Sequence, residues 1–163
     1  MVLSMVSSER GALTARRQQC RVEDHCHNAV AAQPAARRAT VECEPGLVAL
    51  VQPGHLDQIL ANLLSNADKY AGGATLVCAT TDPSGQVEIS VVDAGPGIPA
   101  DFRDDLFQRF SRSASTAHVT GTGLGLFISR ELARANGGDL HHRDAEPTGS
   151  RFVVTLPSAT VDA

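Results

Sequence analysis

The sequence predicts an α/β two-layer sandwich, in which helices cover one face of a mixed, mostly antiparallel sheet. The 163 residues are 42% hydrophobic, which suffices for one domain with one core. Segments with helical apolar spacing and segments with strand-like alternation occur in turn along the chain, and this mixture favours two layers. Residues 1–20 are expected to form a flexible arm, 21–157 the folded domain and 158–163 a tail.

The elements are expected in a definite order. The most clearly patterned is a helix at 54–70, where Leu56, Ile59, Leu60 and Leu63 form one apolar stripe and Pro53 stands near the start. A further helix at 123–136 ends at an asparagine followed by two glycines. The remaining expected elements are a first helix at 22–32, a short helix near 101–106, and strands at 39–44, 47–51, 74–80, 86–93, 139–144 and 150–156.

The strand at 86–93 leads into the most informative loop. Its alternating run ends at Asp93, and Gly95, Gly97 and Ile98 follow directly. A carboxylate at this point can accept a hydrogen bond from an amine, and the glycines leave backbone N–H groups uncovered for an anion. The same pattern also describes many ordinary hairpins, so the segment does not define a site by itself.

The helix at 54–70 carries polar side chains on a face away from its apolar stripe. At about 100° per residue, Asn62, Asn66 and Lys69 fall within roughly 60° of one another. Two amides and an ammonium suit a hydrated divalent cation and the phosphates it bridges. The alternative is a solvated helix face, but asparagine is a poor helix former and two on one face need a reason.

A glycine-rich turn precedes the helix at 123–136. The segment reads Gly121-Thr122-Gly123-Leu124-Gly125-Leu126, and it presents free N–H groups and the positive end of a helix dipole to an anion. Its spacing differs from the dinucleotide-binding fingerprint. The stretch 111–120 just before it has no apolar period and is interpreted as a mobile lid, with Phe107 and Phe110 at its root and Arg109 near the phosphates. The alternative is an ordinary surface loop with an aromatic anchor.

In order and spacing, these four segments resemble the N, G1, F and G2 boxes of the ATP-binding catalytic domain of sensor histidine kinases. That domain belongs to the superfamily of DNA gyrase, Hsp90 and MutL. The resemblance covers roughly residues 22–157, including a last strand that contains Ser150. It implies a Bergerat-type ATP-binding fold with a flexible ATP lid, and ATP with Mg²⁺ as ligands.

The resemblance also implies residue roles. Asn66 would bind Mg²⁺ with Asn62 beside it, and Lys69 would contact phosphate; these are the residues expected to act in catalysis. Asp93 would accept the adenine amine. The other residues expected to bind the nucleotide are Tyr70, Gly95, Gly97, Ile98, Arg109, Gly121, Thr122, Gly123, Leu124, Gly125, Leu126 and Ser150.

Asn62 distinguishes this sequence from the ATP-hydrolysing members of the superfamily that it resembles. Those ATPases carry a glutamate one turn before the metal-binding asparagine, and an amide cannot replace it as a base. Asp57 is about half a turn out of phase with Asn66 and is a poor substitute. A neutral imidazole is already a nucleophile, so transfer to a histidine needs no base from this domain.

The predicted function is therefore the ATP-binding and catalytic part of a two-component histidine kinase. It would present the γ-phosphate to a histidine on a separate dimerisation and phosphoacceptor domain, and a response regulator would follow. His25 and His27 lack the context of that acceptor and are expected on the first helix. The alternatives are an ATP-gated interaction module without transfer, and an anti-sigma-type serine kinase.

Composition limits the partners and the cellular location that can be expected for this chain. The net charge of −4 does not indicate the excess of basic residues that nucleic-acid binding requires, and no apolar run reaches membrane-spanning length. The start lacks the features of a signal peptide, so a cytoplasmic location is expected, with Cys20, Cys26, Cys43 and Cys78 as reduced thiols. A zinc site built from Cys20, Cys26, His25 and His27 is disfavoured, because adjacent helix positions point in different directions.

Overall fold

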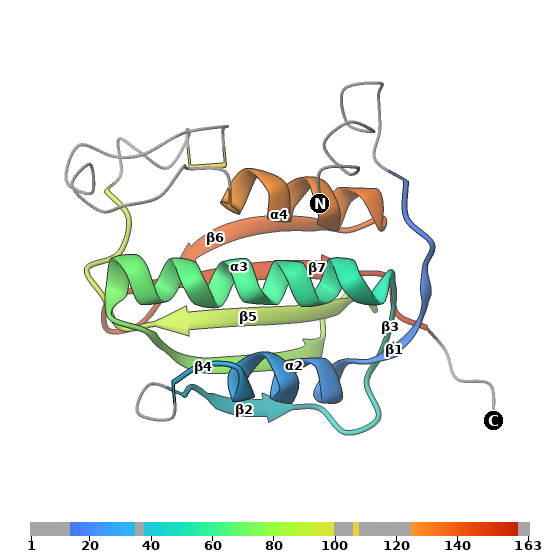
Figure 1. Cartoon of the computed structure of the whole chain (residues 1–163), viewed down its shortest axis with the longest axis horizontal. Helices are drawn as coiled ribbons and strands as arrows, with labels where there is room; N and C mark the ends of the chain where they lie inside the picture. The colour runs from blue at the N-terminus through green and yellow to red at the C-terminus, as the bar shows by residue number, and fades with distance from the viewer. Residues whose placement is uncertain (1–13, 35–37, 100–105, 108–124, 160–163) are drawn as a thin grey trace.

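The computed structural model describes residues 14–34, 38–99, 106–107 and 125–159, and these residues form the expected two-layer α/β sandwich (Figure 1). The three helices of the described residues lie side by side on one face of a five-stranded sheet, with α3 between α2 and α4. The helices are α2 Val22–Ala31, α3 Pro53–Ala71 and α4 Gly125–Ala135, and the strands are β1 Gln18–Arg21, β2 Thr40–Cys43, β3 Val48–Val51, β4 Ala74–Thr81, β5 Val87–Asp93, β6 Asp139–Asp144 and β7 Ser150–Leu156.

The main sheet is mixed and mostly antiparallel, as the sequence predicts. Its strand order is β2-β4-β5-β7-β6, and only the pairing of β2 with β4 is parallel. Most of the expected elements agree with the observed ones to within one or two residues at each end. Of the short helix expected near 101–106, residues 101–105 lie outside the described residues, and Leu106 and Phe107 form a turn.

Both ends of the expected domain differ from the structure. Residues 18–20 were expected in the arm, but they belong to β1, which pairs antiparallel with β3 in a separate two-stranded sheet. At the other end, Ser158 bridges to Ala49, and the backbone N–H of Ala159 donates to the carbonyl of Val48 at 2.9 Å. The folded part therefore extends into both segments, because β3 offers backbone partners on each side.

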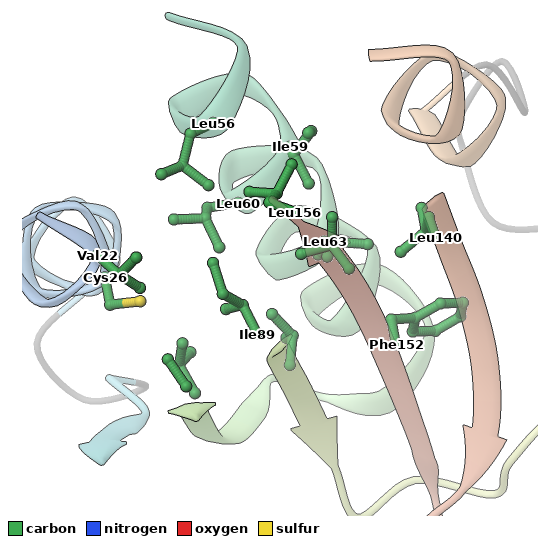
Figure 2. Packing of buried hydrophobic residues seen from close by; sticks show 14 of the residues in the cluster. Val22, Cys26, Leu56, Ile59, Leu60, Leu63, Ile89, Leu140, Phe152 and Leu156 are labelled. Carbon is green, nitrogen blue, oxygen red and sulfur yellow. The ribbon is translucent and has the colours of Figure 1, made fainter. Parts of the chain in front are cut away.

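Helix α3 forms and ends for local reasons. Proline stands in its first turn, and Gly72, with a φ of +76°, ends it in the left-handed conformation that glycine adopts without strain. Its apolar stripe, with Leu56, Ile59 and Leu63 fully buried, faces Ile89 of β5 and Leu156 of β7 (Figure 2). Burial of each such side chain contributes about 1.5–3 kcal/mol, and this anchors α3 on the sheet.

A buried polar cluster joins the start of α3 to the end of α4. The side-chain oxygen of Asn136 accepts from the backbone N–H of Gln52 at 2.9 Å, and its amide nitrogen donates to the carbonyl of Leu132 at 2.7 Å. These backbone partners fix the orientation of the amide. The amide nitrogen also lies 3.1 Å from Nδ1 of His55, so Nδ1 must accept and the imidazole must be neutral.

We expect this cluster to make the fold sensitive to acid. Burial lowers the pKa of His55, so the unfolded chain binds the proton more readily than the folded one. Stability is therefore complete above the unfolded pKa of about 6.5 and falls as the pH drops below it, by about 1.4 kcal/mol for each unit of pKa depression. Urea unfolding at pH 7.5 and 5.5 should show a smaller pH dependence for His55→Gln than for the wild type.

A second histidine serves as the control for that experiment. Burial and the nearby Arg143 also lower the pKa of His141, which is only half-buried on β6. His141→Gln should therefore remove only part of the pH dependence and leave the Asn136 cluster intact. An unchanged pH dependence in His55→Gln would contradict the role given to His55.

Candidate nucleotide-binding site

Three elements bring the expected site residues to the same end of the molecule. The C-terminal part of α3, the C-terminal end of β5 and the first turn of α4 all lie at the left of Figure 1. The apolar stripe of α3 and the alternation of β5 fix their inward faces on the core, so their polar residues point away from it or lie at its edge. The three segments predicted to form one site thus lie at one end of the molecule, and their roles in binding stay predictions.

Asp93 is the most buried charged residue of the site. It is 6% exposed, and its Oδ1 accepts from the backbone N–H groups of Gly95 at 3.0 Å and Ser150 at 3.1 Å. These two hydrogen bonds hold the carboxylate in one orientation. Within the described residues Oδ2 has no partner, which leaves one oxygen able to accept a hydrogen bond from a ligand amine.

The loop glycines are required by close packing around this carboxylate. A Cβ on Gly95 would lie 2.5 Å from the Cβ of Ala71, so the loop rests directly on the end of α3. A Cβ on Gly149, whose φ is +109°, would overlap the backbone carbonyl of Asp93. The turn before β7 is thereby pressed against the end of β5, and this contact brings the N–H of Ser150 to Asp93.

Replacing Gly149 with alanine should disrupt this packing. We expect a loss of about 1–3 kcal/mol in the free energy of unfolding, with weaker nucleotide binding, because the new methyl group must displace the Asp93 backbone. Gly85→Ala is a matched control, since its φ is +91° but nothing lies within 4 Å of its Cβ. Urea unfolding of both variants separates the clash from backbone strain, and equal losses would contradict the prediction.

Ser150 and an aromatic row line the side of β7 next to Asp93. The Ser150 hydroxyl lies 3.0 Å from Nε2 of His142 on β6. The His142 ring packs on Phe152 with 5.2 Å between centroids, and Phe107 meets Phe152 edge-on at 6.3 Å. Phe107 therefore docks beside the site as the sequence predicts, whereas Phe110 lies outside the described residues.

Helix α4 is tied to that aromatic row by a cation. The guanidinium carbon of Arg130 lies 4.9 Å from the centroid of the Phe107 ring, and its Nε donates to Asp139 at 3.0 Å. A cation over an aromatic face is attracted by the ring quadrupole. This contact joins the segment before the expected lid to the helix after it.

Asn62 is engaged in contacts between helices. Its Oδ1 accepts from Nε2 of Gln58 at 2.8 Å, and its Nδ2 donates to Oγ of Ser129 at 3.0 Å and to the carbonyl of Gly125 at 3.4 Å. The catalytic role expected of Asn62 beside Asn66 stays a prediction, and these contacts show how its side chain is held. Its oxygen accepts one hydrogen bond from Gln58 and keeps a second lone pair.

Asn66 and Lys69 fit the ligand side of the site better. Asn66 is half-buried and Lys69 is exposed, and neither has a hydrogen-bond or ion-pair partner within the described residues. A free amide oxygen suits Mg²⁺, which prefers oxygen ligands and keeps several waters. Tyr70 is half-buried on the following position, and Ile98 packs against the edge of the core.

The described part of the glycine-rich turn is its end. Gly125 and Leu126 form the first turn of α4, with Gly125 exposed and Leu126 packed against the core. Gly97, in the other loop, has a φ of +81°. Arg109, Gly121, Thr122, Gly123, Leu124 and the expected lid at 111–120 lie outside the described residues.

Sequence reasoning missed Ser129, His142 and Arg130 as neighbours of the site. Ser129 is fully buried within α4, where a serine is an unusual choice for a core position. That irregularity in the apolar pattern was the available signal. His142 was assigned to a strand without any role, and only the pairing of β6 with β7, which sets His142 opposite Phe152, shows its position.

The other histidines and cysteines lie elsewhere. His25 and His27 are on α2 as expected, and Nδ1 of His25 lies 2.6 Å from Oδ1 of Asp57. Burial raises the pKa of the Cys26 thiol to about 12, so it stays protonated and inert. The described residues contain no group of three or more side chains that could hold a metal ion by themselves.

None of the helices in the described ranges combines the length and apolar character that crossing a membrane would require.

Comparison with known proteins gives consistent matches. The family model of histidine kinase-, DNA gyrase B- and HSP90-like ATPases matches residues 51–160. The sensor protein KdpD of Rathayibacter rathayi is 41% identical over 114 residues, which cover 70% of this chain and 13% of that protein. The signal transduction histidine-protein kinase AfsQ2 of Streptomyces coelicolor is 39% identical over 118 residues, covering 72% of this chain and 22% of that protein. The chain thus spans less than a quarter of either relative.

Solved structures share the fold over nearly the whole chain. Full-length ShkA in complex with AMPPNP matches with a TM-score of 0.81 and 27% identity, over 99% of this chain and 35% of that one. The mycobacterial sensor histidine kinase MprB matches with a TM-score of 0.76 and 25% identity, over 90% of this chain and 100% of that one. The predicted resemblance is confirmed.

Proposed function

The chain belongs to the family of histidine kinase-, DNA gyrase B- and HSP90-like ATPases, and we propose that it is the catalytic part of a sensor histidine kinase that transfers the γ-phosphoryl group of ATP to a histidine. The acceptor would lie on a dimerisation and phosphoacceptor domain, either elsewhere in a longer protein or on another chain. A response regulator would take the phosphoryl group next. Because the reaction consumes ATP, the domain would work in the cytoplasm.

Adenine recognition would depend on Asp93. Its Oδ2, which has no partner among the described residues, would accept from the exocyclic amine, while Oδ1 stays bound to the Gly95 and Ser150 amides. A rigid acceptor costs no reorganisation when the base arrives. A 6-oxo purine would present an oxygen to this carboxylate, so the arrangement favours adenine over guanine.

The phosphates would lie between α3 and the start of α4. The first-turn N–H groups of α4 carry the positive end of the helix dipole, and Lys69 supplies an ammonium on the facing helix. Asn66 would hold Mg²⁺, which would neutralise charge on the phosphate oxygens. The residues present fit such an ion because the Asn66 amide, which has no partner among described residues, offers an oxygen ligand, whereas the Asn62 amide already contacts Gln58 and Ser129.

The transfer itself is a displacement at phosphorus. The lone pair of a neutral imidazole nitrogen forms the new N–P bond as the bond from phosphorus to the β,γ-bridging oxygen breaks. ADP leaves with that electron pair, and the imidazole releases its remaining N–H proton to water. The domain contributes orientation and charge, which is where most of the acceleration in phosphoryl transfer arises.

The observation that favours a kinase acting on histidine over an ATPase is the environment of Asn62. Hydrolysis and serine phosphorylation both need a base near the γ-phosphate, and this position holds an amide that is engaged with Gln58 and Ser129. Asp57, the nearby carboxylate on α3, interacts with His25 instead. An acceptor that brings its own nucleophilic lone pair fits such a site.

The proposal is tested by incubating the protein with γ-labelled ATP, Mg²⁺ and the dimerisation domain of a related sensor kinase. We expect label on the acceptor in a form that is labile to acid and stable to base, as phosphohistidine is. Label that survives acid would instead indicate a serine kinase, and release of inorganic phosphate alone would indicate an ATPase. Nucleotide binding with none of these products would indicate a nucleotide-gated interaction module.

A further inference from the structure

The side chain of Asn62 forms hydrogen bonds with groups on both helices. On α3 it accepts from Gln58, and across the interface it donates to the Ser129 hydroxyl and the Gly125 carbonyl of α4. An asparagine amide has two N–H donors, and both are directed at α4. The residue therefore links one turn of α3 to the first turn of α4.

The partner of Asn62 on α4 is isolated from water. Ser129 is fully buried, and Asn62 is its hydrogen-bond partner among described residues. A serine inside a helix commonly bonds to the carbonyl one turn earlier, which here belongs to Gly125. That carbonyl accepts from the same Asn62 amide, so the contact holds the backbone at the point where α4 begins.

This contact lies between Asn66, which would bind the metal, and the first turn of α4, which would bind the phosphates. Asn62 stands one turn before Asn66, a rise of about 6 Å on α3. Gly125 begins α4, whose first-turn N–H groups would hold the phosphate chain. A shift of α4 along α3 would therefore change the distance between the metal-binding amide and the phosphate-binding amides.

We propose that Asn62 is a positioning residue: through Ser129 and Gly125 it fixes the start of α4 relative to Asn66, so that Mg²⁺ and the first-turn N–H groups of α4 act on the same triphosphate. The inference deepens the proposed function and rests on it. It gives a definite part to Asn62, which the sequence predicts to act in catalysis beside Asn66. A purely structural contact would change stability alone, whereas a positioning contact changes how much Mg²⁺ improves nucleotide binding.

The measurement is the Mg²⁺-dependent gain in affinity for AMPPNP, taken as the ratio of its dissociation constants in EDTA and in Mg²⁺. Calorimetry would compare the wild type with Ser129→Ala, which deletes only the buried hydroxyl, and Asn62→Leu, which deletes the whole contact. We expect both to lower the gain about tenfold, as the loss of one or two hydrogen bonds would. The double variant should be no worse than Asn62→Leu, because the two residues form one contact.

Ser90→Ala is the matched control. Ser90 is also a buried serine, 1% exposed, but it lies on β5 and is assigned no part in the site. It should shift the melting temperature without changing the Mg²⁺ gain. If Asn62→Leu does not fold, Gln58→Ala releases the Asn62 carbonyl from the other side and should lower the gain in the same direction.

Each outcome tests either the positioning role of Asn62 or the proposed kinase function, and the two can be told apart. A Mg²⁺ gain that persists in Ser129→Ala and Asn62→Leu overturns this inference alone. A gain lost in Asn62→Leu but kept in Ser129→Ala and Gln58→Ala shows that Asn62 binds the metal directly, and this also overturns it. A wild type without any gain contradicts both the inference and the metal site at Asn66. Variants that lose the gain, in a wild type that transfers no phosphoryl group, contradict the proposed kinase and support the inference.

Discussion

Replacing Asp93 with asparagine is expected to weaken ADP binding by at least ~100-fold while the protein stays folded. The asparagine Oδ1 can still accept from the N–H groups of Gly95 and Ser150, so the hydrogen bonds within the protein remain. The position of Oδ2, which has no partner among described residues, becomes an NH₂ group. That group would face the adenine amine donor to donor, in a place that is only 6% exposed for the residue as a whole.

The same change should relax the discrimination between purines. Inosine diphosphate carries an oxygen where ADP carries the amine, and the NH₂ group of Asp93→Asn can donate to it. Calorimetry with the two nucleotides should therefore show the preference for ADP shrinking or reversing in the variant. Asp93→Ala is the comparison, because it removes both oxygens, leaves two buried N–H groups without an acceptor, and should lower stability as well.

Equal ADP affinity in Asp93→Asn and the wild type would show that the base does not bind at this carboxylate. The family relationship would stand, but the adenine site would have to be placed elsewhere. A variant that unfolds would contradict the separate roles given to the two oxygens.

The helices and strands could be predicted where a pattern of apolar residues runs along one continuous segment of the sequence. Helix α3 has an apolar stripe over its whole length and a glycine at its end, and β6 and β7 were predicted with their observed bounds. Strand β1 has only one buried residue, Cys20, so alternation gives no usable signal there. It forms because β3 offers a free edge, and such pairing depends on residues far apart in the chain.

The site shows the same division. Asp93 and the glycines after it could be identified because a strand end and its loop form one continuous segment. The contacts of Asn62 could not be predicted, because its partners Gly125 and Ser129 are 63 and 67 residues away. Helical spacing puts Asn62 and Asn66 on one face, but it does not show that α4 covers the first and leaves the second without a partner.

The second large effect is expected from Asn66→Ala. Loss of the amide that would hold Mg²⁺ should lower the rate of phosphoryl transfer ~100-fold or more, because the metal stabilises the charge that develops on the phosphate oxygens. Binding of ADP in EDTA should change little, since Asp93 and the base pocket are untouched. The rate is measured by transfer of label to the acceptor domain at saturating ATP.

Stability should move in the opposite direction to activity in this variant. Alanine is the better helix former by about 0.5 kcal/mol, and Asn66 has no partner among described residues to lose. Asn28→Ala on α2 is the control, because Asn28 is also an asparagine within a helix, is exposed, and lies on another helix. It should gain similar stability and keep full activity. An Asn66→Ala protein that is both more stable and fully active would show that Asn66 does not bind the metal. A side chain that costs stability is expected to be kept only where function requires it.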